Sequence, residues 1–163
     1  MILLFLYIKI FACMSSPEIP KDLNNLSVHL SSRKIDKMIV HLDTNWEGRR
    51  LCQLWTENLN CEITNEEVLS TPSKYLGKIF SDDLVNGLIA LKDVDFPFDE
   101  TIVYTKKESV TKKILIHSFD WGYNITLLEE GVYMEEEYEY SIQFSFKRSS
   151  QSRLVLFDFI IAG

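Results

Sequence analysis

The chemically most distinctive stretch of the chain runs from Lys112 to Trp121 and reads KKILIHSFDW. Apolar and polar side chains alternate along it, which predicts a β-strand with Ile114 and Ile116 on one face. The strand ends abruptly on Asp120 and Trp121, so a large flat ring is placed at a sheet edge or at the mouth of a loop. Such a ring either fills one end of a hydrophobic core or stacks against a sugar, and both interpretations are open at this point.

The polar neighbours of this ring make the second interpretation chemically concrete. Tyr123 and Asn124 follow Trp121 almost directly. Aromatic faces stack on the apolar C–H faces of pyranose rings, while carboxylate, amide and phenol groups hydrogen-bond the sugar hydroxyls. The candidate carbohydrate-binding residues are therefore Trp121, Asp120, Tyr123 and Asn124.

Signatures of an enzyme are missing from the sequence. It has no glycine-rich phosphate loop, no nucleophilic serine framed by glycines and no two histidines one helical turn apart. His29, His41 and His117 are scattered, and the three cysteines lack the spacing of zinc ligands. We therefore expect a non-catalytic binding protein without a metal or cofactor.

The composition limits the size of the fold and the class of partner. A length of 163 residues with 46% hydrophobic residues suits one packed domain with an extension. The formal net charge is −7. An acidic chain repels the phosphate backbone, so nucleic acid is not an expected partner.

The first residues allow two interpretations of where the protein works. Residues 1–14 are almost wholly apolar apart from Lys9, which is typical of a short signal peptide or of a start site upstream of the true one at Met14. The run is too short to span a bilayer comfortably, so no membrane span is expected.

Export would make the chain a secreted β-sandwich that binds a glycan or a protein. This alternative predicts a disulfide between Cys52 and Cys61 and glycosylation at Asn25 or Asn124. A protein kept in the cytoplasm would show neither modification.

Composition divides the rest of the chain into two parts. Residues 15–73 are polar, interrupted by prolines and acidic towards their end, so we expect an extended arm and a linker. Residues 74–163 predict an all-β, immunoglobulin-like antiparallel sandwich, since short apolar or alternating runs recur about every ten residues. These runs, of which the last is expected at the centre of a sheet, are 88–94, 101–105, 110–118, 124–128, 137–146 and 153–161.

The order of these motifs resembles a known family, the family 21 carbohydrate-binding module. Its most specific stretch reads lysine-x-valine-x-valine-arginine-x-threonine-phenylalanine-aspartate-x-tryptophan, and Lys112–Trp121 is similar to it. The strands at 89–94 and 102–107 resemble those that precede this stretch, and the alternating aromatic strand at 138–146 resembles one that follows it. The closing tryptophan-aspartate-asparagine-asparagine motif has no counterpart before Gly163, so the resemblance is to a divergent, C-terminally truncated member.

This module occurs in the glycogen-targeting regulatory subunits of type 1 serine/threonine protein phosphatase. Those subunits carry an upstream docking segment, and KMIVHLD at residues 37–43 resembles its start. The resemblance implies that Lys37, Ile39, His41 and Asp43 contact the phosphatase catalytic subunit by strand addition. It also implies a cytoplasmic, glycogen-associated protein that directs dephosphorylation of glycogen-metabolising enzymes.

Overall fold

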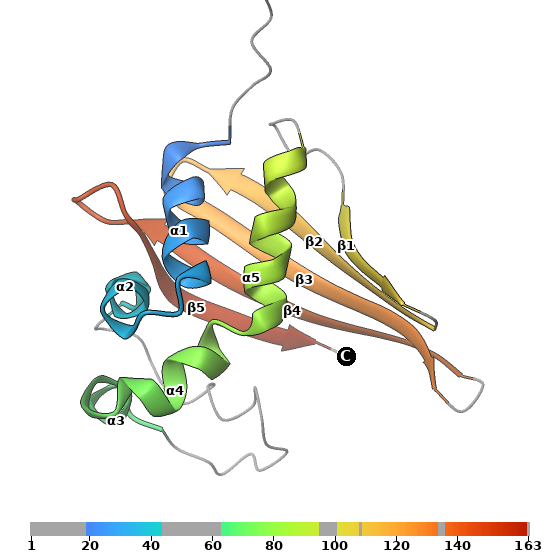
Figure 1. Ribbon diagram of the computed structural model, residues 1–163, viewed down its shortest axis with the longest axis horizontal. Coiled ribbons are helices and arrows are strands. Elements are labelled where there is room, and N and C mark those ends of the chain that lie inside the picture. Colours follow the sequence, from blue (N-terminus) through green and yellow to red (C-terminus); the bar gives the residue numbers. More distant parts are fainter. Residues whose placement is uncertain (1–18, 44–62, 95–100, 108, 134–135, 163) are drawn as a thin grey trace, which may run out of the picture.

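The computed structural model describes residues 19–43, 63–94, 101–107, 109–133 and 136–162. Helices dominate the first half of these residues and strands the second (Figure 1). In chain order the elements are α1 (Lys21–Ser31), α2 (Ile35–Met38), the short 3₁₀ helix η1 (Ile39–His41), α3 (Asn65–Ser70), α4 (Pro72–Ile79), α5 (Asp82–Ala90), the 3₁₀ helix η3 (Leu91–Asp93), β1 (Ile102–Lys107), β2 (Val110–Phe119), β3 (Gly122–Tyr133), β4 (Glu136–Arg148) and β5 (Leu154–Ala162).

The strands form one antiparallel sheet in the order β1-β2-β3-β4-β5, so each strand pairs with its neighbour in sequence. The predicted antiparallel sheet is thereby confirmed, and the last five predicted strands all fall on observed ones. The register aligns Ile114 with Leu127, and Leu127 with Ile142. Side chains of one parity therefore form continuous apolar rows across the sheet.

Helices α1 and α5 lie across one face of this sheet, and the shorter helices gather at one end (Figure 1). Leu23, Leu26 and Leu30 recur at helical spacing along α1 and are buried, so the helix presents one apolar stripe to the sheet. Helix and sheet residues form a single hydrophobic core. Its large members with almost no exposed surface are Tyr123, Phe80, Phe144, Phe146, Phe159, Leu23, Leu26, Leu30, Leu76, Ile79 and Leu84.

The all-β sandwich is not confirmed, because in the described chain helices occupy the place expected for a second sheet. The strand predicted at 88–94 is wrong: these residues end α5 and form η3. The Ser81 side chain caps α5 by accepting a hydrogen bond from the Leu84 N–H. Leu84, Leu88 and Leu91 then follow at helical spacing and are buried, a pattern that an apolar run of this length does not distinguish from a strand.

The extended arm predicted for residues 15–73 is also a wrong prediction where the structure describes it. Helix α1 belongs to the same core as the sheet, so the expected boundary between 73 and 74 does not separate two bodies. Thr64 caps α3, and Pro72 stands in the first turn of α4, where its missing N–H costs nothing. The expected linker is therefore a helix–helix junction. The apolar leader at 1–14 lies outside the described residues.

Strand β5 lies at one end of the strand order rather than at the centre, which corrects the prediction for 153–161. A bulge opposite Ser145 and Phe146 shifts its alternation, so apolar residues face both sides of the sheet. Leu42 forms an isolated bridge with Leu156 and covers part of this edge. The nearly continuous apolar run thus reflects a bulged, partly covered edge strand.

Candidate functional site

One face of the sheet carries no helix within the part of the chain that the structure describes, and we call it the open face. Ile114 and Ile116 point to the helices and are buried. Because side chains alternate, Leu115, His117 and Phe119 point to the open face.

Three aromatic rings form a row across one end of the open face, which we call the aromatic strip. Phe119 ends β2, Trp121 lies in the turn to β3, and Phe157 lies in β5. The rings of Phe119 and Trp121 stack with centroids 4.9 Å apart and an interplanar angle of 7°. Trp121 meets Phe157 edge-on with centroids 5.6 Å apart. Phe119 is 40% exposed and Trp121 43%, so Trp121 does not fill the core.

A close backbone approach places the turn that carries Trp121. Phe119 and Gly122 pair across the β2–β3 hairpin, with Asp120 and Trp121 between them. A Cβ atom on Gly122 would lie 1.9 Å from the carbonyl oxygen of Phe146, so only glycine fits at this position. The hairpin end therefore lies tightly against β4.

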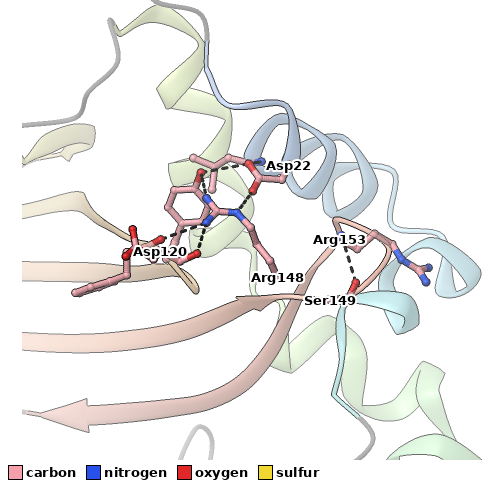
Figure 2. Close-up of polar contacts among 8 residues, drawn as sticks. Asp22, Asp120, Arg148, Ser149 and Arg153 are labelled. Carbon is pink, nitrogen blue, oxygen red and sulfur yellow. Dashed lines mark hydrogen bonds and ion pairs between the residues drawn. The ribbon is translucent and has the colours of Figure 1, made fainter.

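Arg148 of β4 ties the same turn to helix α1 (Figure 2). Its Nε donates to Asp22 Oδ2 at 2.8 Å and its Nη2 to the Tyr123 hydroxyl at 2.9 Å. Its Nη1 donates to the carbonyl oxygens of Phe119 at 3.2 Å and Asp120 at 3.0 Å. The hydrogen bond to Asp22 is the main reason why the pKa of Arg148 is raised. We call Asp22, Tyr123 and Arg148 the Arg148 clamp.

Polar groups border the aromatic strip. The Lys147 ammonium lies 5.5 Å from the Phe157 ring centroid and forms an ion pair with Asp43. Asn124 lies on the open face, two residues beyond Gly122. Its Oδ1 is buried and has no hydrogen-bond partner among the described residues. Leaving such an oxygen unpaired costs free energy.

Three of the four predicted carbohydrate-binding residues share this end of the open face, and the fourth does not. Asp120 and Trp121 are exposed at the turn, with Asn124 next along the strand. Tyr123 is only 1% exposed, and its phenol is held by the clamp on the helix side. The structure does not support its predicted sugar contact, because Tyr123 pairs with Ser118 on the helix-facing side of the sheet, whereas Asn124 points to the open face.

Sequence reasoning missed two members of the strip. Phe119 could have been found, since it shares the parity of Leu115 and His117. Phe157 could not, because the bulge in β5 breaks the alternation that would place it.

The predicted phosphatase-docking residues lie in α2, η1 and the residues that follow, not in an extended strand. Lys37 is exposed, whereas Ile39 packs against the core. Asp43 pairs with Lys147, and its N–H donates to Leu156 O at 2.9 Å. The segment is therefore integrated into the fold at the β5 edge.

His41 is the most enclosed residue of that segment, with 1% exposure. Its Nδ1 donates to the Leu154 carbonyl oxygen at 2.6 Å, which leaves Nε2 as an acceptor, 2.9 Å from His29 Nδ1. Burial lowers the pKa of His41 to about 4, and electrostatic interactions with His29 and Arg153 act in the same direction. The His41 ring is thus neutral near pH 7 and packs in the interior of the protein.

Among the described residues, no group of three or more His, Cys, Asp or Glu side chains is placed to hold a metal. In the same ranges, no helix is long and apolar enough to cross a membrane.

An ion-pair group ties α5 to the sheet. The Lys112 Nζ lies 2.8 Å from Asp83 Oδ2 in α5 and 3.1 Å from Glu129 Oε2 in β3.

Comparison of the chain with family models, curated proteins and solved structures gives no match in any of the three. The functional assignment therefore rests on the chain's own residues.

Proposed function

We propose that the chain is a non-catalytic binding protein that takes a glucan, such as glycogen or a related polymer, on its aromatic strip. The observation that carries this proposal is the exposed stack of Phe119 and Trp121, held in place by the turn and by Arg148. Large exposed rings that are held rigidly on an open surface are typical of a binding site.

The chemistry of the strip suits a sugar. The apolar C–H face of a glucose unit would stack on the exposed part of the Trp121 indole, while Phe119 supports the ring from one side. Asp120 and Asn124 would hydrogen-bond the hydroxyls. Release of water from the exposed rings would add to affinity. Little conformational entropy would be lost on binding, because Arg148 already holds the carbonyl groups of the turn.

Recruitment of type 1 phosphatase stays a prediction that rests on the resemblance alone. Strand addition by Lys37, Ile39, His41 and Asp43 would require α2 and η1 to unfold and His41 and Asp43 to leave their places beside β5. A targeting role in glycogen metabolism depends on that step. The alternative of a secreted protein that binds a glycan or a protein partner would use the same strip.

Trp121→Ala is expected to lower retention on glycogen beads by about tenfold or more, as loss of a central aromatic contact does at binding sites. The measurement compares bound and free protein at equal concentration. Leu69→Ala is the matched control, because Leu69 is 39% exposed but lies on α3. Equal retention of the wild type, Trp121→Ala and Leu69→Ala would exclude the strip as the glucan site.

A further inference from the structure

The turn that presents Trp121 is held by a residue far along the chain. Three consecutive carbonyl oxygens of this turn accept hydrogen bonds from Arg148. Those of Phe119 and Asp120 accept from Nη1, and that of Trp121 accepts from the backbone N–H at 2.8 Å. A turn bound at every carbonyl by one residue has little freedom to move the ring it carries.

Arg148 is itself fixed from the other side. Asp22 is only 14% exposed at its side chain, and it pairs with Arg148 Nε while also accepting from the Tyr123 hydroxyl at 3.2 Å. The guanidinium lies 5.0 Å from the Tyr123 ring. Figure 2 shows it between helix α1 and the turn. The clamp therefore connects α1 to the end of the β2–β3 hairpin.

We infer that Arg148 is the positioning residue of the aromatic strip, which sets the stack of Trp121 on Phe119 without touching the ligand. The effect on glucan affinity rests on the proposed function, whereas the effect on the ring does not. Only arginine can serve, since its planar fork reaches Asp22, Tyr123 and the turn carbonyls at once. A lysine ammonium keeps the charge but cannot make this set of contacts.

Arg148→Lys is expected to move the indole N–H signal of Trp121 in an ¹⁵N-labelled sample towards that of a solvent-exposed tryptophan. The chain has 3 tryptophans, and Trp121→Phe identifies the signal. Affinity for a soluble maltooligosaccharide is expected to fall about tenfold, because a displaced ring no longer meets the sugar. Arg153→Lys is the matched control, since the guanidinium of Arg153 points away from the clamp in Figure 2.

An unchanged Trp121 signal in Arg148→Lys overturns the inference. If the wild type binds no maltooligosaccharide, the proposed function fails, and the indole signal still decides whether Arg148 positions the ring. If Arg148→Lys does not fold, Asp22→Asn tests the inference instead. This substitution removes the carboxylate that holds the guanidinium but does not replace Arg148 itself. A shift of the Trp121 signal in the same direction supports the inference, and an unmoved signal overturns it.

Discussion

Gly122→Ala is expected to destabilise the protein by about 3 kcal/mol, the upper part of the range for overpacking. The new Cβ atom would lie 1.9 Å from the Phe146 carbonyl oxygen and 2.9 Å from the Lys147 Cα. Both neighbours are backbone atoms at the end of the β3–β4 ladder, where Gly122 pairs with Lys147, so neither can move aside without breaking that end of the ladder. The turn and Trp121 would move with the hairpin end.

Urea unfolding measures this effect, and a second glycine provides its control. A Cβ atom on Gly77 in α4 would meet nothing within 4 Å. Gly77→Ala should therefore stabilise the protein by about 0.5–1 kcal/mol, since alanine favours the helix. The same substitution of alanine for glycine is thus expected to lower the free energy of unfolding at Gly122 and to raise it at Gly77. A Gly122→Ala variant as stable as the wild type would show that the hairpin does not lie this close to β4.

Acidification is expected to remove about 3 kcal/mol of stability through His41 alone. Burial lowers its pKa in the folded protein from 6.5 to about 4. A base with a lowered pKa stays neutral when folded, so its contribution is fully present above pH 6.5. The unfolded chain binds the proton first as the pH falls, and stability is lost down to about pH 4. Each pKa unit corresponds to about 1.4 kcal/mol, so about 2 kcal/mol should be lost by pH 5.

Urea unfolding at pH 7 and pH 5 isolates this contribution, because most carboxylates remain charged over that interval. His41→Gln should show a much smaller change between the two pH values than the wild type, whatever its stability at pH 7. His117→Gln, at an exposed position of β2, should keep the wild-type change. Equal pH dependence in the wild type and His41→Gln would rule out a buried neutral His41.

The sheet was predictable because its strands carry their pattern locally. Alternation in 110–118 and 137–146 specifies both the strands and their inner faces, and the chain pairs each strand with the next. The helices were missed for an equally local reason. The apolar stripe of α1 consists of a few leucines among polar residues after Pro20. Burial against the sheet stabilises it, and no single-sequence pattern reveals that partner.

The candidate site was predictable only in its most local part. Asp120 and Trp121 follow a strand whose alternation is clear in the sequence, so their place at a turn was predictable. Tyr123 was assigned to the wrong face because adjacency in sequence is not adjacency on a strand. The contact between Arg148 and Asp22 joins residues 126 positions apart. The sequence around either residue does not predict this contact.

Titration of the ¹³C- and ¹⁵N-labelled wild type with a maltooligosaccharide tests the proposed glucan site most directly. We expect the indole signal of Trp121 to shift and saturate, together with ring signals of Phe119 and Phe157. The ring signals of Tyr75, which is 3% exposed in α4, should stay in place. Trp121→Ala should abolish the saturable shifts. A titration that leaves the Trp121 signal unmoved, or that moves only signals away from the strip, would contradict the assignment of the open face as a glucan-binding surface.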